Sequence, residues 1–371
     1  MTRVVLSPHN VAAFPEGGGH FWVYQQYVQG LQAAGAEVWW MERFDGDADQ
    51  IPGALERLAR FGLRDRVLFY TGDAGAPRWL TTDERAATDA IAETDLLLNF
   101  HYRLEPALLE RFRTTALVDI DPGLLQVWIA TGQLDVADHD VYFTTGATVG
   151  TPDAAFPDGD LPWQRIAPAV SLDDWPMTNG EEPGPFTTVS SWWGDEWYSF
   201  GADVFENNKR VSFLAFRAVA EHTDEPLELA VNTGPKDETD MDLMRASGWR
   251  VRHALDVASD PDTYRAYVRG SRGEFSCAKP SCMYLRNGWV SDRTLCYLAS
   301  GRPAVVQYTG PNPQLDGGEG LLRFATVAEA AAAVDAVAAD YEHHRRAARA
   351  LAEEHFDARK VAERILMLAL P

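Results

Sequence analysis

The sequence has few cysteines, few basic residues and no long apolar run. Its three cysteines, Cys277, Cys282 and Cys296, are odd in number and match no common zinc-binding spacing, so we expect reduced thiols rather than disulfides or a metal site. No apolar stretch reaches the ~18 residues of a membrane-spanning helix, and the apolar run near the N-terminus is too short for a secretory signal. We therefore expect a cytoplasmic protein.

The shortage of basic residues gives the chain a strongly negative charge. It has 33 lysines and arginines against 55 aspartates and glutamates, which makes the formal net charge −22 at pH 7. A surface of that sign repels nucleic-acid backbones and anionic membranes, so neither is expected as a partner. A nucleotide-sized ligand is still compatible with this charge, because one phosphate site needs only a few local donors.

What the sequence does contain is enough apolar material for two cores. Its 371 residues are 46% hydrophobic, which favours two domains of about 150–200 residues each. Short apolar strands alternate with helical segments, a pattern typical of α/β folds with parallel sheets. The alternation stops in a proline-rich stretch over residues 150–185 and then restarts. We predict two Rossmann-like doubly wound domains facing a cleft, over residues 1–170 and 171–355, with a terminal helix over 356–371 that can cross back to the first domain.

One helix-to-strand segment carries the clearest functional signal. A polar turn opens a short apolar helix, Gly301 and Pro303 end it, and a β-branched strand follows. Ser291 and Asp292 stand at the start of this helix. The unpaired backbone N–H groups there can be capped by a side chain or can hold a diphosphate.

A glycine run follows the first predicted strand. Gly17, Gly18 and Gly19 would let the backbone approach a ligand closely, and they expose N–H groups where a helix begins. His20 comes next, and a histidine suits a general base because its pKa lies near neutral pH. The same residues could equally form a hinge with a histidine that only packs or caps, and both interpretations stay open.

These segments together resemble GT-B glycosyltransferases. Residues 273–310, which include the run LASGRPAVV, and residues 320–324 are similar to the nucleotide-sugar half of bacterial GT-B enzymes. The resemblance implies metal-independent transfer of a sugar from a nucleotide diphosphate to a small acceptor. It implies a donor on the second domain, an acceptor on the first, and no cofactor besides the nucleotide sugar as co-substrate. The acidic residue with which many members hold the donor ribose falls near Cys296 here, and Asp292 is the nearest acidic candidate.

The resemblance also assigns individual roles. His20 would be the base of an inverting enzyme, Asp119 or Asp121 could orient it, and Asn99 and His101 would contact the acceptor. Turn chemistry is the alternative for the aspartates, and an exposed loop is the alternative for Asn99 and His101. For Arg293, which is one of the donor candidates, an ion pair with Glu274 is the alternative. Gln314 and Asp316 are candidates for contacts with sugar hydroxyls. The candidates for donor binding are Gly18, Gly19, Ser191, Trp192, Lys209, Arg252, His253, Ser291, Asp292, Arg293 and Gly310.

Two other functions fit the same residues. A nucleotide-sugar 2-epimerase would use the same fold without an acceptor, and Asp119 and Asp121 are its only obvious acid–base supply. A non-catalytic nucleotide- or sugar-binding module is the second. The frequent Ala, Arg, Asp and Gly are typical of GC-rich bacteria, in which glycosylation of natural products is common, so we expect an acceptor of that kind. The sequence leaves open the donor sugar, the nucleotide base and whether transfer inverts or retains configuration.

Overall fold

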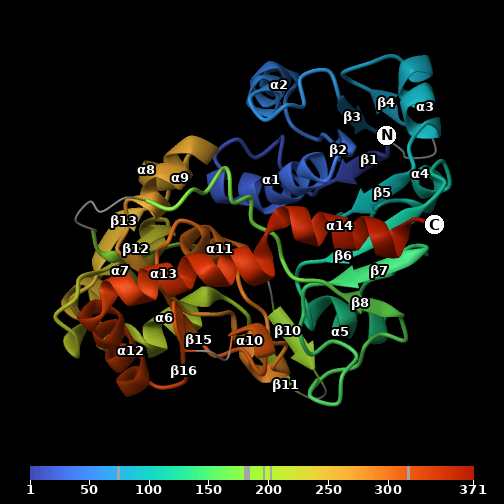
Figure 1. The fold of residues 1–371 in the computed structure, drawn as a ribbon. Coiled ribbons are helices and arrows are strands. Elements are labelled where there is room, and N and C mark those ends of the chain that lie inside the picture. Colours follow the sequence, from blue (N-terminus) through green and yellow to red (C-terminus); the bar gives the residue numbers. More distant parts are fainter. Residues whose placement is uncertain (73–75, 179–183, 195–196, 201–202, 316–317) are drawn as a thin grey trace. The chain divides into compact units, whose positions relative to one another are not determined.

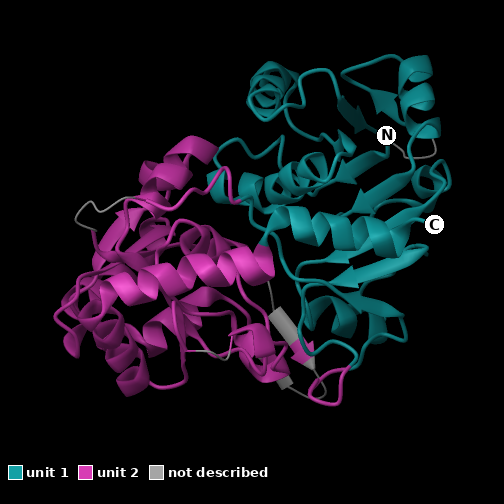
Figure 2. Ribbon diagram, viewed as in Figure 1, with its two compact units in different colours: residues 1–150, 157–171, 357–371 teal, residues 151–156, 172–356 magenta. Residues whose placement is uncertain are grey.

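The structure is a computed structural model, and it describes residues 1–72, 76–178, 184–194, 197–200, 203–315 and 318–371. The chain divides into two compact units (Figure 2). Unit 1 comprises residues 1–150, 157–171 and 357–371, and unit 2 comprises residues 151–156 and 172–356. Of the sugar-binding candidates, Asp316 lies outside the described residues.

Unit 1 is built on one eight-stranded sheet (Figure 1). The strand order is β4-β3-β2-β1-β5-β6-β7-β8, and every neighbouring pair is parallel except β3 and β4. The order runs outward in opposite directions from β1 and β5, so the sheet has its topological switch point between these two strands. The strands are β1 (Arg3–Ser7), β2 (Glu37–Arg43), β3 (Val67–Thr71), β4 (Arg78–Trp79), β5 (Leu96–Asn99), β6 (Thr115–Asp119), β7 (Val141–Thr144) and β8 (Trp163–Arg165).

Helices cover this sheet, and the last helix of the chain is one of them. Helix α14 packs on α1, and a side chain at Gly30 of α1 would put its Cβ 2.2 Å from the carbonyl oxygen of Ala358. A β-bridge between Val170 and Asp357 joins the same region. The helices of unit 1 are α1 (Gly18–Ala33), α2 (Ile51–Ala59), α3 (Glu84–Ala92), α4 (Pro106–Leu109), α5 (Leu124–Ala130) and α14 (Ala358–Ala369).

Unit 2 repeats the same plan with six strands. Its sheet has the order β13-β12-β9-β14-β15-β16, is parallel throughout, and has its switch point between β9 and β14. A separate two-stranded hairpin, β10 (Trp197–Phe200) and β11 (Asp203–Glu206), follows β9. The sheet strands are β9 (Phe186–Ser191), β12 (Leu227–Asn232), β13 (Arg250–His253), β14 (Gly273–Ser276), β15 (Ala304–Gln307) and β16 (Leu321–Phe324).

The helices of unit 2 lie in the connections between these strands. They are α6 (Lys209–Ala215), α7 (Glu238–Ala246), α8 (Leu255–Ala258), α9 (Pro261–Arg269), α10 (Pro280–Leu285), α11 (Asp292–Ala299), α12 (Val327–Ala339) and α13 (Tyr341–Leu351). Helix α13 ends at Leu351, and a π-helical turn, Ala352–Phe356, follows. Short 3-10 turns occupy Ala48–Gln50, Arg217–Glu221, Pro235–Asp237 and Pro313–Leu315. Two parallel, doubly wound sheets confirm the predicted fold class.

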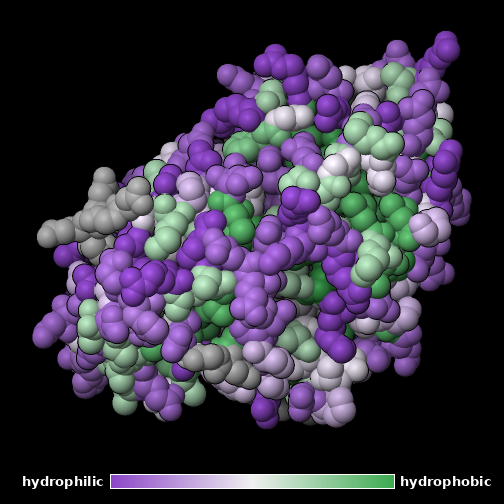
Figure 3. All heavy atoms as spheres, viewed as in Figure 1, coloured by the Kyte–Doolittle hydropathy of each residue, from purple (hydrophilic) through white to green (hydrophobic). Residues whose placement is uncertain are grey.

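The surface is mostly hydrophilic on the face that Figure 3 shows. Apolar residues appear there in scattered patches between the hydrophilic ones. Within the described part of the chain, no helix is both long enough and apolar enough to span a membrane.

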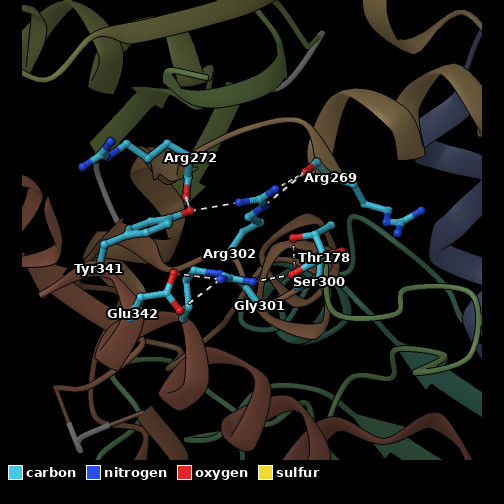
Figure 4. A network of polar contacts seen from close by, with 9 residues as sticks. Thr178, Arg269, Arg272, Ser300, Gly301, Arg302, Tyr341 and Glu342 are labelled. Atoms are coloured by element: carbon cyan, nitrogen blue, oxygen red, sulfur yellow. Dashed lines mark hydrogen bonds and ion pairs between the residues drawn. The ribbon is translucent and has the colours of Figure 1, made fainter. Parts of the chain in front are cut away.

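A polar network ties the end of α11 to α9 and α13 within unit 2 (Figure 4). The guanidinium of Arg302, which is only 4% exposed, donates to the carbonyl of Arg269 through two nitrogens, at 3.0 and 2.7 Å. It also donates to the hydroxyl of Tyr341 at 3.0 Å, and that hydroxyl donates to the carbonyl of Arg272 at 2.5 Å. One buried cation thus satisfies acceptors from two other elements.

Removal of this cation should destabilise unit 2. We expect Arg302→Met to lower the free energy of unfolding by about 2–5 kcal/mol, because two buried acceptors lose a charged donor. The measurement is the melting temperature by calorimetry. The control is Arg359→Met, since the side chain of Arg359 is 63% exposed and its ion pair with Glu363 is a surface pair. Equal melting temperatures for the two variants would contradict a structural role for the network.

Candidate functional site

Unit 1 contains a cavity of about 400 Å³ at the switch point of its sheet. Its walls come from the segments that follow β1, β5 and β6 at their carboxyl ends, together with α1 and α5. This is where ligands bind in open α/β sheets. The lining residues are His9, Tyr24, Phe100, His101, Tyr102, Arg103, Ile120, Asp121, Trp128, Gln133 and Leu134.

Two histidine rings stack on one wall of this cavity. The centroids of His9 and His101 lie 4.9 Å apart, with 23° between the ring planes. Burial lowers the pKa of His9, Arg103 lowers it further, and Asp121 opposes the shift. Burial also lowers the pKa of His101, to about 4, and the charges of His9, Arg43 and Arg103 act in the same direction. Both imidazoles are therefore neutral at pH 7.

Asn99 holds His101 rather than facing a ligand. Its Oδ1 accepts from the backbone N–H of His101 at 2.9 Å, and its Nδ2 donates to the carbonyl of the same residue at 3.2 Å. The Nδ2 also donates to Nε2 of His139 at 3.0 Å, whose Nδ1 is directed at the carbonyl of Ala137. Because Asn99 has no exposed surface, its predicted contact with an acceptor does not fit, whereas His101 lines the cavity as that prediction requires.

A buried glutamate fixes the loop that carries His9. Glu42, at the end of β2, is 1% exposed and accepts from the backbone N–H groups of Val11 and Ala12 at 2.5 and 2.8 Å. Its other oxygen accepts from the indole N–H of Trp40 at 2.8 Å. Burial raises the pKa of Glu42 to about 7, and the three hydrogen bonds oppose that shift. Sequence reasoning did not identify this residue.

His20 lies beside the cavity and supports the same loop. It is the third residue of α1, and its Nε2 donates to the carbonyl of His9 at 2.8 Å. Since a carbonyl only accepts, the neutral ring has its proton on Nε2 and its lone pair on Nδ1. Burial lowers the pKa of His20, and backbone carbonyls partly oppose this. His20 is not one of the described residues that line the cavity, so its role as base stays a prediction.

The two aspartates at the carboxyl end of β6, Asp119 and Asp121, have different environments. Asp121 is exposed and lines the cavity, where its amide and its carboxylate contact the hydroxyl of Tyr102 at 3.2 and 3.4 Å. Asp119 has no exposed surface and accepts from Thr144, from Gln126 and from the amide of Asp121. Burial raises the pKa of Asp119 to about 7. Asp119 thus shapes the loop of Asp121, and none of these bonds joins it to His20.

The switch point of unit 2 gathers positive charge. Ser191 ends β9 and is exposed, and Lys209 starts α6 and is half-buried. Burial lowers the pKa of Lys209 to about 7, the charges of Arg293 and Lys279 lower it as well, and Glu274 opposes them. Three cations near one carboxylate leave a local excess of positive charge, which suits an anionic ligand.

Arg293 is committed to the protein rather than open to a ligand. Its Nε pairs with Oε1 of Glu274 at 2.7 Å, one terminal nitrogen donates to the carbonyl of Val189 at 2.9 Å, and the other donates to the hydroxyl of Ser276. Glu274 has no exposed surface, so the arginine neutralises a buried carboxylate. The ion pair named as the alternative in the sequence is thus present, and direct phosphate contact by Arg293 is not favoured.

The start of α11 borders a small cavity in unit 2. Ser291 is the residue before the helix, Asp292 is its first residue, and both are half-buried. The cavity measures about 20 Å³, enough for one water molecule, and its lining includes Ser276, Ser291 and Thr294. A nucleotide does not fit this cavity, so a diphosphate would have to bind outside it.

Several donor candidates have other structural roles. Trp192 has no exposed surface, and its indole N–H donates to Asp240 at 3.1 Å, so it is a core residue and not a ligand contact. Gly310 has φ of 120°, and a Cβ there would lie 2.4 Å from the carbonyl oxygen of Arg286, which explains the glycine without a ligand. Arg252 is 46% exposed and pairs loosely with Glu228 at 3.6 Å.

The remaining candidates are compatible with a ligand but make only local contacts. His253 accepts through Nδ1 from the backbone N–H of Leu255 at 3.3 Å. Gly18 and Gly19 form the first turn of α1, and Gly17 precedes it; a Cβ at Gly17 would lie 2.4 Å from the ring of Phe14. Among the described residues, no group of three or more His, Cys, Asp or Glu is arranged to hold a metal ion.

Three residues that line the cavity, His9, Trp128 and Gln133, were not predicted from the sequence, and only His9 had a signal there. His9 comes two residues after the end of β1, as His101 comes two residues after the end of β5, so the strand-end criterion that selected His101 also applies to His9. The same criterion selects Arg103, which follows the same strand as His101 and also lines the cavity. Trp128 on α5 and Gln133 after it have no such signal, because only the tertiary fold brings them to the cavity.

Comparison with known proteins identifies the fold. No protein-family model and no curated protein sequence matches the chain. Several solved structures do match. Sucrose-phosphate synthase from Thermosynechococcus elongatus is 13% identical, with a TM-score of 0.59 over 99% of this chain and 98% of that chain, and HepE of Anabaena in complex with UDP-glucose is 12% identical, with a TM-score of 0.61 over 99% of both chains. An alpha-glucosyltransferase in complex with UDP and a 13-mer DNA is 10% identical, with a TM-score of 0.62 over 99% of this chain and 98% of that chain. The likeness extends over nearly the whole chain, and it shows that the chain has the GT-B fold.

Proposed function

We propose that this protein is a glycosyltransferase that moves a sugar from a nucleoside diphosphate to a hydroxyl group of a small molecule held in the unit 1 cavity. The observation that carries the proposal is a pair of sites at equivalent places in the two units. Unit 1 has a cavity with neutral imidazoles at its switch point, and unit 2 has an excess of cations at its own. The HepE and alpha-glucosyltransferase structures contain UDP-glucose and UDP, which supports a donor of that class.

The donor end of the proposal rests on charge. A departing nucleoside diphosphate gains negative charge, and fixed cations and backbone N–H groups stabilise it as it leaves. Lys209, the exposed Ser191 and the start of α11 at Ser291 supply such groups.

We expect turnover to be independent of divalent metal. Lys209 and Lys279 would balance the charge of the diphosphate that Mg²⁺ balances in many phosphate sites. The measurement is the initial rate of nucleoside diphosphate release with and without an excess of EDTA. A rate that falls with EDTA and recovers with added Mg²⁺ or Mn²⁺ would contradict the expectation.

Loss of the base should distinguish His9 from His20. For transfer with inversion, we expect His9→Gln to lower kcat by about 100-fold or more, since a general base contributes on that scale. His20→Gln should have a smaller effect, because Nε2 of His20 is bound to the carbonyl of His9 and acts through the loop. On the acid side of the pH profile, the midpoint of the decrease in kcat/KM should lie below pH 6.5, because burial lowers the pKa of both rings from that value.

The stereochemistry of the product is the control for that prediction. Transfer with retention of configuration, with kcat unchanged in both variants, would remove an enzymic base from the mechanism. A large loss in His20→Gln and none in His9→Gln would return the role to His20, as the glycine run suggested.

The donor is tested by a thermal-shift screen with UDP, GDP, dTDP, CMP and ADP. A nucleotide present at 100 times its Kd should stabilise the protein by about 2.7 kcal/mol. We expect one nucleoside diphosphate to raise the melting temperature and CMP to have little effect. No shift with any nucleotide at millimolar concentration would contradict the proposed donor class.

A further inference from the structure

We propose that the unit 1 cavity is built for a neutral, hydroxylated ring such as a sugar, and not for a sugar phosphate, a carboxylated sugar or an apolar aromatic alcohol. The inference deepens the proposed function, because it names the chemical class of the acceptor. It concerns binding, so it can be tested in the absence of any nucleotide sugar.

The charges that face the cavity cancel. Arg103 and Asp121 line it with one charge of each sign, and they act on His9 in opposite directions. The His9 and His101 rings add no charge at pH 7, because burial holds both pKa values below the ordinary one.

The next cation outward is neutralised as well. Arg43 also acts on His101, but it is paired with Asp45 at 2.9 Å and with Glu105 at 3.0 Å. No charged residue other than Arg103 and Asp121 is among the described residues that line the cavity. A phosphate or carboxylate placed here would meet one cation and one carboxylate, which gives it no net attraction.

The cavity separates an aromatic surface from polar groups. Tyr24, Phe100 and Trp128 supply aromatic rings, and Tyr24 and Phe100 are held edge to face at 5.4 Å. The exposed side chains of Asp121 and Gln133 supply polar atoms on the same cavity. A sugar ring has an apolar C–H face that packs on aromatic rings and hydroxyl groups that hydrogen-bond at its edge.

The polar groups are positioned rather than loose. The hydroxyl of Tyr102 accepts from the amides of Ile120 and Asp121 at 3.0 and 3.2 Å and lies 3.4 Å from the carboxylate of Asp121. Arg103 is in the segment whose backbone Asn99 holds through both of its amide atoms. An apolar aromatic alcohol would cover these groups without satisfying them, which opposes its binding.

The test is equilibrium binding to the full chain without donor, by calorimetry. The panel pairs neutral mono- and disaccharides with their phosphorylated and uronic acid forms and includes 2-naphthol as an apolar aromatic alcohol that is neutral at pH 7. We expect a neutral sugar to bind about tenfold or more tightly than its charged partner at the same ionic strength. Tighter binding of a charged form, or binding of 2-naphthol with no binding of any sugar, would overturn the inference.

Two variants in the cavity and one control variant outside it make the test specific to this cavity. Trp128→Leu should weaken sugar binding about tenfold, whereas Trp39→Leu should leave it unchanged, because Trp39 lies on β2 and stacks with Arg3 instead. Asp121→Lys should bind the phosphorylated sugar more tightly than the neutral sugar, the reverse of the wild-type preference. If Asp121→Lys still prefers the neutral sugar, the charge of the cavity does not determine which sugar binds. The inference fails if Trp128→Leu binds as the wild type does.

Failure of this inference and failure of the proposed function give different results. Neutral sugars that bind without being glycosylated from any nucleotide sugar would remove the proposed function and keep the inference. Efficient transfer to a phosphorylated or carboxylated acceptor would keep the function and remove the inference.

Discussion

Lys209→Met is expected to lower kcat/KM by about 100- to 1,000-fold, the scale on which loss of one group that stabilises a developing charge affects catalysis. Lys209 starts α6 at the switch point of unit 2, and its pKa of about 7 reflects burial and two neighbouring cations. A diphosphate at this place would favour the charged form of the lysine. Methionine keeps most of the side-chain volume and removes only the charge.

The pH dependence of nucleotide binding gives an independent check on Lys209. Since the free lysine loses its proton near pH 7, binding of a diphosphate above pH 7 must take up a proton. The affinity for the nucleoside diphosphate should therefore fall as pH rises from about 7, and this fall should disappear in Lys209→Met. Lys236→Met is the control, because Lys236 is an exposed lysine of the same unit. Wild-type turnover in Lys209→Met would remove the lysine from the donor site.

The second large effect is expected in Glu42→Ala. Removal of this carboxyl group leaves three buried N–H donors without an acceptor, those of Val11, Ala12 and Trp40. We expect the free energy of unfolding to fall by about 3–5 kcal/mol. Because Val11 and Ala12 lie two and three residues after His9 in the same loop, the acceptor KM should rise as well. Unchanged acceptor KM in the folded variant would show that Glu42 supports the fold without positioning His9.

Glu42→Gln tests the electrostatic part of the same contact. The pKa of Glu42 is raised from 4.5 to about 7, so its contribution to stability is fully present below pH 4.5 and is lost as pH rises through about 7. The histidines with lowered pKa act in the opposite sense below pH 6.5, but they are the same in both proteins. As pH rises from 4.5 to 7, the free energy of unfolding of the wild type should therefore decrease relative to that of Glu42→Gln. A difference that does not vary with pH would contradict the raised pKa.

The sequence predicted what depends on local pattern. The helix from Asp292 to Ala299, its start at Ser291 and its end before Gly301 were all readable from capping and breaking residues. The start of α12 is of the same local kind, because Thr326 and Glu329 form a capping box with the spacing typical of that motif. The two doubly wound sheets followed from the alternation of short apolar strands and helices.

What the sequence did not predict depends on partners far along the chain. Asn99 looked like a ligand contact because it ends a strand, but its partner His139 lies 40 residues away. For Arg293 the sequence left phosphate contact and an ion pair with Glu274 both open, and only the fold shows the buried pair. His9 lies in the run Pro8-His9-Asn10, which is also typical of a turn. Strand-end position selects residues at the carboxyl edge of each sheet, but burial and pairing decide which side chains stay open to a ligand.

The most direct measurement of the central claim is product analysis. The protein is incubated with the sugar nucleotide selected by the thermal-shift screen, with and without a neutral sugar acceptor, and the products are identified by mass spectrometry. We expect one glycosylated acceptor for each nucleoside diphosphate released, with both products formed about 100-fold or more slowly in Lys209→Met. A nucleotide sugar that is epimerised without an acceptor, or one that binds and is never consumed across the acceptor panel, would contradict it.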